Sequence, residues 1–380
     1  MFPLADSLKS GNRGRLRWGS LLCIITCASS LVGCSNRHSG GTAEDPRAMI
    51  ERLLPRSVHD RAGWAADIYA PFVTLDIRPT PQNVCAVIAV IEQESGFRVN
   101  PVVPDLPQIA RRALDERAQH AGVPLVLVHS ALQLSSSTGR TYNEWIDSAR
   151  TEKDLSDIFE DFTGKVPLGK TLLARWNPIR TRGPMQVNVA FAEAFVHERP
   201  YPYRTEGSIG DELFTRRGSL YFGVAHLLAY PASYVSYLYR FADFNAGQYA
   251  SRNAAFQNAV AIASGVSLVR DGALLPHEGD EDAPGITELA IQLLARRLNI
   301  AQEDIRHALA QGKTKEFEQT SLYQGVFALA ERMLRRPLPR AQVPHIELHG
   351  PKITRKLTTD WYAHRVHERF AQCQRQPGAD

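Results

Sequence analysis

Residues 83–97, NVCAVIAVIEQESGF, set two carboxylates at the end of a strongly apolar segment. The apolar residues predict a helix that begins near Asn83 and ends near Gly96, since glycine commonly follows the last helical turn. A segment that is apolar on most of its faces is expected to be buried. The sequence therefore predicts a central buried helix that ends in acidic residues.

The two acids of this helix point in different directions. At 100° per residue, Glu94 lies within about 60° of Asn83 and of the apolar stripe formed by Val87, Val90 and Ile91. Glu92 lies on the far side, nearest Cys85 and Ala89. Desolvation raises the pKa of a carboxyl group and makes it usable as a general acid near neutral pH. Glu94 is therefore the candidate acid, although a solvated carboxylate at a helix end is the simpler alternative.

The rest of the chain predicts a mostly α protein. Its 380 residues leave room for two domains or for one large domain with insertions. Helical periodicity recurs in residues 108–122, 219–230, 286–299, 303–312, 321–334 and 358–373. Residues 232–264 predict two helices joined near Gly247, and alternating strand patterns are scarce.

The N-terminus predicts a signal peptide. Four basic residues precede the apolar stretch SLLCIITCASSLVG, residues 20–33, which is too short to cross a bilayer as a helix. Residues 34–47 are polar and Gly-rich, as in a flexible tether. Without residues 1–33 the chain has 40 basic and 39 acidic residues, so no nucleic acid partner is indicated.

Residues Leu31–Cys34 resemble the lipobox of bacterial lipoproteins, which are cleaved before a cysteine that then carries acyl chains. The resemblance implies lipidation at Cys34 and a membrane anchor, and Ser35 after it implies an outer membrane lipoprotein facing the periplasm. A plain secreted protein with a chance cysteine is the alternative. Palmitate labelling that disappears in a Cys34→Ala variant would support the lipoprotein.

Cleavage would leave Cys85 and Cys373 as the other two cysteines. In an oxidising compartment they are expected to form a disulfide, with two separate buried thiols as the alternative.

Three short segments resemble the motifs of lytic transglycosylases, which are lysozyme-like enzymes that cleave peptidoglycan. IEQESGF (91–97) resembles the segment that carries their catalytic Glu, RGPMQVN (182–188) their Gly-Leu-Met-Gln motif, and DFNAG (243–247) their Tyr-Asn-Ala-Gly motif. The chain also resembles an uncharacterised family of Gram-negative lipoproteins that share these segments.

The resemblance implies a lysozyme-like domain at 48–277 with an insertion at about 101–180, followed by a C-terminal helical region at 278–380. Glu94 would be the catalytic acid and base, with no metal and no cofactor. The substrate would be peptidoglycan, cut at the MurNAc-GlcNAc bond to leave 1,6-anhydro-muramoyl ends. The expected substrate-binding residues are Ser95, Met185, Gln186, Asn188, Phe244 and Asn245, with Met185 and Phe97 as groove walls. For Met185, Gln186, Asn188 and Phe97, a helix cap and core packing are the alternatives.

Two departures from the family pattern leave a second function open. Phe244 replaces a Tyr whose hydroxyl reaches the catalytic carboxyl in the family, so the sequence predicts that this hydrogen bond is lost. Pro184 replaces the motif's Leu. The alternative is a non-catalytic peptidoglycan-binding or scaffolding lipoprotein.

Two other groups of residues have side chains suited to binding a ligand. A cluster of tyrosines could stack on sugars, but core aromatic residues are the favoured interpretation: Tyr221, Tyr230, Tyr234, Tyr237 and Tyr239. The pairs His345/His349 and His364/His367 have spacings that could ligate a metal. No acid or cysteine clusters with them in the sequence, so surface histidines are expected.

Overall fold

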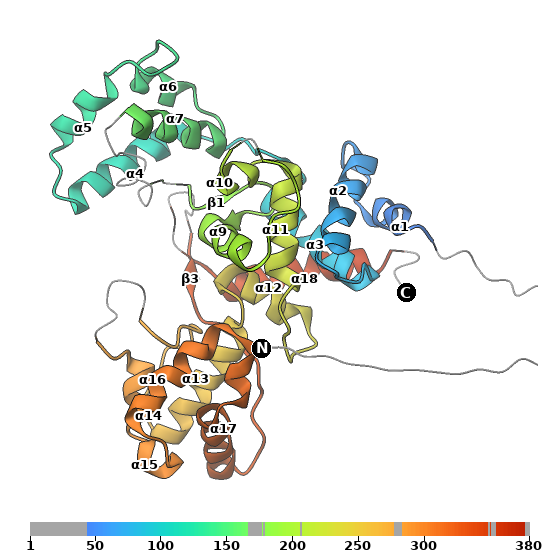
Figure 1. The fold of residues 1–380 in the computed structure, drawn as a ribbon, viewed down its shortest axis with the longest axis vertical. Coiled ribbons are helices and arrows are strands. Elements are labelled where there is room, and N and C mark those ends of the chain that lie inside the picture. Colours follow the sequence, from blue (N-terminus) through green and yellow to red (C-terminus); the bar gives the residue numbers. More distant parts are fainter. Residues whose placement is uncertain are drawn as a thin grey trace, which may run out of the picture. The chain divides into compact units, whose positions relative to one another are not determined.

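The computed structural model describes residues 44–165, 177, 179–205, 207–276, 283–348, 350 and 355–376. The predicted signal peptide, Cys34 and nearly all of the tether lie outside these residues. The fold is mostly α, as predicted (Figure 1). Its elements are α1 (Pro46–Leu53), α2 (Arg61–Thr74), α3 (Pro81–Glu94), α4 (Leu106–His120), α5 (Leu125–Leu132), α6 (Tyr142–Ser148), α7 (Glu152–Lys165), β1 (Thr181–Arg182), β2 (Val187–Asn188), α9 (Val189–Glu198), α10 (Ile209–Glu212), α11 (Arg216–Leu228), α12 (Tyr237–Ala246), α13 (Ala250–Ser264), α14 (Ile286–Gln292), α15 (Ala295–Leu298), α16 (Gln302–Ala310), the 3-10 helices η2 (Gln311–Lys313) and η3 (Lys315–Gln319), α17 (Ser321–Leu334), β3 (Glu347–Leu348), β4 (Leu357–Thr358) and α18 (Thr359–Gln374).

The predicted buried helix is α3. Thr80 caps its N-terminus by accepting a hydrogen bond from the Asn83 amide, and Pro81 occupies its first turn, where its missing N–H costs nothing. Every residue from Val84 to Ile91 is buried. The helix ends at Glu94, and the next turn places Gly96 and Phe97 at positive φ angles of 58° and 63°. Such a backbone is unfavourable for a phenylalanine and needs support from the surrounding packing.

The core around α3 combines the two ends of the described chain. Buried residues of α1, α2, α11 and α12 share it with Tyr362, Ala363, Val366 and Cys373 of α18. Figure 1 shows α18 beside α3 and α12. The structure joins Cys85 and Cys373 in a disulfide with a Cα–Cα distance of 5.6 Å. Of the two alternatives that the sequence left open for these cysteines, the structure contains the disulfide.

A second core unites α13 with α14, α16, η3 and α17. The two helices predicted around Gly247 are confirmed as α12 and α13, and Gly247 caps α12 with a φ of 107°. α17 has the predicted bounds, whereas the stretch predicted over 286–299 is divided into α14 and α15. The C-terminal helical region predicted from the sequence starts at residue 278. Because α13 packs with the later helices, residues on both sides of that position build this core.

A third cluster lies within residues 101–180, where the sequence predicts an insertion. Leu106 of α4, Tyr142 and Ile146 of α6 and Leu155 of α7 are buried together, and Phe214 joins them from the connection between α10 and α11. This segment therefore has an apolar core of its own, to which a residue outside the segment contributes.

The described strands are short, in agreement with the scarcity of alternating patterns in the sequence. β1 and β2 pair antiparallel, with Thr181 opposite Asn188, and β3 and β4 pair antiparallel with Glu347 opposite Thr358. The first pair closes the turn that carries the segment Gly183–Gln186. In the part of the chain that the structure describes, no helix has the length and apolar character needed to cross a membrane.

The disulfide generates a stability prediction. It links residues 288 positions apart, so it restricts a very large loop in the unfolded chain. We expect reduction to lower the free energy of unfolding by about 5–6 kcal/mol on the chain-entropy model. Urea unfolding with and without reductant measures this difference, and a Cys85→Ala/Cys373→Ala variant should show no response to reductant. Detection of both thiols as free groups in the denatured, non-reduced protein would contradict the prediction.

Candidate functional site

Glu94 is partly buried at the last position of α3 and is held by a tyrosine from the other end of the chain. The Tyr362 hydroxyl donates a hydrogen bond to Glu94 Oε1 at 2.5 Å. Tyr362 is itself only 5% exposed. This short contact from a buried donor fixes one carboxyl oxygen and helps to orient the whole group.

The protonation state of Tyr362 follows from its surroundings. Burial, together with the negative charge of Glu94 and the hydrogen bond to it, raises the pKa of the Tyr362 phenol well above 10. The hydroxyl therefore keeps its proton at neutral pH and remains a donor to Glu94.

The hydroxyl that Phe244 lacks has a substitute on another helix. Phe244 cannot donate to the Glu94 carboxyl, and Tyr362 on α18 supplies a hydrogen bond to it instead. Nothing in the sequence near Glu94 signals it, because the two residues are 268 positions apart. The buried Phe244 instead packs its ring against His226, with the ring centroids 5.1 Å apart.

Asn245 of α12 contacts α18, the helix whose Tyr362 holds Glu94. Thr359, a fully buried residue in the first turn of α18, donates its hydroxyl to Asn245 Oδ1 at 2.7 Å. Thr359 and Tyr362 are three residues apart, so their side chains share one face of the helix. The first turns of α18 therefore contact both Asn245 and Glu94. Among the residues that the structure describes, the side-chain nitrogen of Asn245 has no hydrogen-bond partner.

The turn at Gly183–Gln186 serves the fold. Gly183 has a φ of 74°, and a Cβ atom built there would lie 1.9 Å from the Leu213 carbonyl oxygen, so only glycine fits. Met185 is fully buried and packs against Gly223 of α11, where an added Cβ would meet its Sδ at 2.3 Å. The predicted role of Met185 as a groove wall is therefore corrected: it is a core residue with no surface to offer a substrate.

The side-chain amide of Gln186 is occupied within the protein. Its Oε1 accepts from the Thr181 hydroxyl at 2.9 Å, and its Nε2 lies 3.2 Å from both Glu152 Oε2 and the Gly183 carbonyl oxygen. A sugar N-acetyl group would have to displace these partners. Gln186 therefore ties the turn to α7, the helix that carries Glu152.

Two further predicted binding residues have structural partners. Asn188 caps α9, accepting from the amides of Ala190 and Phe191 through Oδ1, which is the cap role weighed as an alternative. Ser95 is 8% exposed, and its hydroxyl donates to the Ile91 carbonyl oxygen at 3.1 Å. Phe97, half-buried, packs edge-on against Trp64 at 5.3 Å between centroids.

The tyrosine cluster is largely part of the core, as favoured. Tyr230 and Tyr234 both donate to the buried carboxylate of Asp243, and Tyr237 donates to Asn83 Oδ1 at 2.5 Å. Tyr221 is buried among other aromatic rings, and Tyr239 packs on Tyr234. Asp243 in turn accepts from the amides of Tyr249 and Ser251 at the start of α13.

No metal site is formed within the described ranges, where no three His, Cys, Asp or Glu side chains are grouped as a ligand set. His349 lies outside these ranges. His364 is more than half exposed and contacts Asp360, while His367 is half-buried.

His226 of α11 is a partly buried ionisable group that the sequence does not single out. Its ring lies between Phe191 and Phe244, with Nε2 3.2 Å from the Phe244 carbonyl oxygen. Among the described residues its buried Nδ1 has no hydrogen-bond partner. Burial lowers the pKa of His226 to about 4, because a second ring proton would have no acceptor. In the sequence, the one feature that indicates His226 is its position as a polar residue within an apolar helix.

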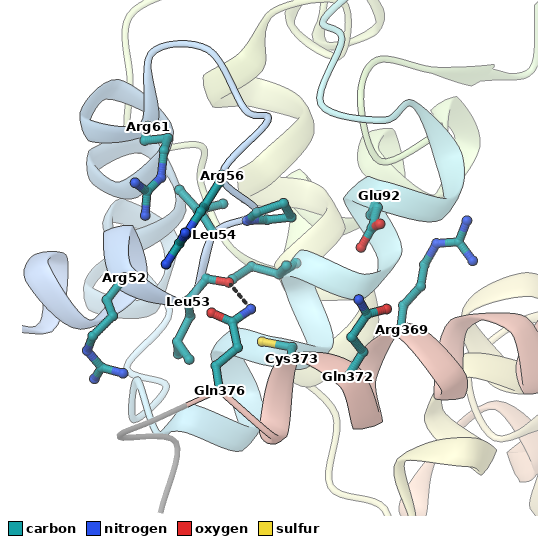
Figure 2. Close-up of a pocket in the computed structure, with 12 residues that line it drawn as sticks. Arg52, Leu53, Leu54, Arg56, Arg61, Glu92, Arg369, Gln372, Cys373 and Gln376 are labelled. Carbon is teal, nitrogen blue, oxygen red and sulfur yellow. Dashed lines mark hydrogen bonds between the residues drawn. The ribbon is translucent and has the colours of Figure 1, made fainter.

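Glu92 lies on the side of α3 away from the apolar stripe, as the helical wheel predicts. It lines a cavity between α3 and α18 together with Ile88 and Cys373 (Figure 2). The two acids of the opening segment therefore belong to separate sites.

The comparisons with known proteins place the chain in a family. Residues 57–376 match DUF1615, a family described as protein of unknown function, and the chain belongs to that family. "Uncharacterized protein YaiW" of Escherichia coli (strain K12) is 48% identical over 362 residues, which cover 94% of this chain and 97% of the relative. No solved structure matches. The predicted membership of an uncharacterised family is confirmed at this level.

The pKa of His226 generates a prediction about acid stability. The folded-state pKa of about 4 lies below the ordinary value of 6.5, so the unfolded chain binds more protons between these values. The stabilisation is fully present above pH 6.5 and is lost as the pH falls toward 4. We expect the free energy of unfolding to fall by about 2–3 kcal/mol more in the wild type than in His226→Gln over this range.

Urea unfolding at several pH values measures the difference. His307→Gln, at an exposed position of α16, is the matched control and should retain the wild-type pH dependence. Equal pH dependence of the wild type and His226→Gln would contradict the buried, neutral histidine.

Proposed function

We propose that this family member is a peptidoglycan lytic transglycosylase in which Glu94 acts as both acid and base. The observation that carries the proposal is the contact between Tyr362 and Glu94. A partly buried acid at the end of an apolar helix, held by a dedicated buried donor, is typical of a group whose orientation matters for chemistry. The segments around Glu94 and Asn245, which resemble two of the transglycosylase motifs, add to this support.

The geometry suggests a division of labour between the two carboxyl oxygens. Oε1 accepts the Tyr362 hydrogen bond in either protonation state of Glu94. We assign the mobile proton to Oε2. In the proposed reaction, Glu94 donates that proton to the glycosidic oxygen as the bond from C1 breaks.

The second step returns the proton to the enzyme. The Glu94 carboxylate takes the proton of the sugar's own 6-hydroxyl while that oxygen bonds to C1, which forms the 1,6-anhydro ring. The leaving sugar keeps the first proton, so Glu94 ends protonated as it began. This reaction needs one carboxyl group, in contrast to glycosidases that use a pair of carboxylates.

Asn245 is the best-placed candidate for binding the substrate near Glu94. Its Oδ1 is fixed by Thr359, so its amide nitrogen is directed by that contact and can donate to a carbonyl oxygen such as that of an N-acetyl group. The lipobox resemblance at Leu31–Cys34 supports a site of action at the outer membrane, facing the periplasm, where peptidoglycan is within reach.

A non-catalytic peptidoglycan-binding or scaffolding lipoprotein is the second candidate. The observation that favours it is the use of the Gly183–Gln186 segment by the fold: Met185 is buried, and Gln186 is bonded to Thr181, Gly183 and Glu152. Met185 and Gln186 are the residue types of the transglycosylase motif. Burial of Met185 and the hydrogen bonds of the Gln186 amide leave neither side chain available to a sugar. Product analysis separates the two candidates.

The first prediction for this function concerns Glu94→Gln. Glutamine keeps the size and can accept from Tyr362, but it cannot supply a proton. We expect the variant to lose about 10²–10⁴-fold in release of anhydro-muropeptides from purified sacculi, measured by mass spectrometry, with its fold intact. Glu92→Gln is the matched control and should retain most of the activity, since its carboxylate lies in the separate cavity. Wild-type turnover by Glu94→Gln would show that the acid is wrongly assigned, and absence of product from the wild type would favour the binding protein.

The second prediction concerns the orientation of the acid. Tyr362→Phe removes only the hydroxyl that holds Glu94 Oε1. We expect kcat to fall by about tenfold or more with little change in KM, because the hydrogen bond orients the acid and does not bind the sugar. The pH profile of kcat should also shift, which loss of packing alone would not cause. Tyr237→Phe, which removes the hydroxyl bonded to Asn83 at the other end of α3, controls for the loss of a buried hydrogen bond. An unchanged kcat and pH profile in Tyr362→Phe would exclude this role.

A further inference from the structure

The cavity on the Glu92 side of α3 has the composition of a ligand site. Its volume is about 670 Å³, and it lies between the end of α1, the connection to α2, α3 and α18. Figure 2 shows Arg56 and Arg61 on one side of it, and Glu92 and Arg369 on the other. Leu53, Leu54 and Ile88 give it an apolar wall. Cavities of this size, largely apolar with a few charged groups, are typical of small-molecule sites.

The charges of the cavity are unbalanced. Four arginines line it against a single acid, Glu92. Arg52 is paired with Glu44, with 2.7 Å between its Nη2 and the carboxylate. Within the described residues the other three, Arg56, Arg61 and Arg369, form no ion pair, which leaves an excess of about two positive charges beside Glu92.

Two of these guanidinium groups also have unsatisfied donors. The Nε atoms of Arg61 and Arg369 are buried, and neither has a hydrogen-bond partner among the residues that the structure describes. Arg61 Nη2 donates to the Glu51 carbonyl oxygen, which fixes the position of its guanidinium group. A buried N–H without an acceptor is costly, so the protein itself leaves these two guanidinium groups incompletely satisfied.

We propose that this cavity binds a phosphate monoester. A monoester carries a charge of about −1.5 to −2 at neutral pH, which matches the excess charge, whereas a carboxylate carries only −1. Its oxygens can accept from several guanidinium forks at once. The cavity is larger than a phosphate group, so the organic part of the ester lies against Leu53, Leu54 and Ile88.

The phosphate monoester can belong to a soluble molecule or to a lipid headgroup. The cavity is built from α1 onward, directly after the tether that follows Cys34. If Cys34 is lipidated, a tether of this length keeps α1 within about 40 Å of the membrane. A headgroup is therefore within reach, and the experiment must separate the two sources.

Binding by the purified mature chain tests the proposal with two probes. Inorganic phosphate is titrated by calorimetry, and phosphatidylcholine vesicles with and without phosphatidic acid are tested by co-sedimentation. We expect saturable binding that is weakened about tenfold or more in Arg56→Gln/Arg369→Gln. Arg332→Gln/Arg336→Gln removes the same charge from exposed positions at the end of α17 and should bind as the wild type does.

Glu92→Gln gives a result of opposite sign. It removes the one negative charge from the cavity, so affinity for phosphate should rise severalfold. Misfolding cannot produce this gain, so the variant keeps the test decisive even if the double arginine variant is unstable. Binding of inorganic phosphate supports a soluble ester, and binding only to phosphatidic acid vesicles supports a headgroup.

Three results would overturn the proposal: no saturable binding to either probe, equal losses in the two arginine pairs, or unchanged or weaker binding by Glu92→Gln to the probe that the wild type binds. The proposal is independent of the proposed function, because Glu94 lies on the other side of α3. Release of anhydro-muropeptides measured on the same preparations therefore reports separately on that function.

Discussion

Helix α18, the last of the described chain, packs along α3 and is cross-linked to it by the disulfide between Cys85 and Cys373. Eleven residues, or about 16 Å of helix, separate Cys373 from Tyr362, whose hydroxyl reaches Glu94. The cross-link and the hydrogen bond therefore hold the two helices at both ends of their contact. The orientation of Glu94, the attachment of Asn245 through Thr359 and one wall of the arginine-lined cavity all depend on the docking of this one helix.

Two acids only two residues apart serve different surfaces because α3 is a helix. A separation of two residues turns the side chain by about 200°. Glu94 faces Tyr362, and Glu92 faces the cavity that Arg56, Arg61 and Arg369 line. The residues from Val84 to Ile91 are all buried, so rotation of α3 would disrupt close packing on every face of the helix. The burial of α3 thus fixes the direction of both carboxyl groups.

The segment Gly183–Gln186 shows how a motif can be kept for its backbone. Gly183 and Gln186 both have positive φ angles, and the Met185 side chain fills the space left by Gly223. The hydrogen bonds of the Gln186 amide close the turn and reach Glu152 of α7. Similarity to the transglycosylase motif is therefore explained by the demands of the turn alone. The case for catalysis consequently depends on Glu94 and its tyrosine rather than on this segment.

The sequence by itself determined the local elements: the bounds of α17, the buried helix α3, the junction at Gly247 and the opposite directions of Glu92 and Glu94. Helical periodicity and capping act within a few residues, so they are legible in one short window of sequence. Only the tertiary structure decided that Tyr362 replaces the hydroxyl missing at Phe244, that Met185 and Gln186 are used internally, and that Arg369 meets Arg56 around one cavity. These contacts join residues far apart in the chain, and their choice depends on which apolar faces bury one another most completely, a property of the whole packed chain.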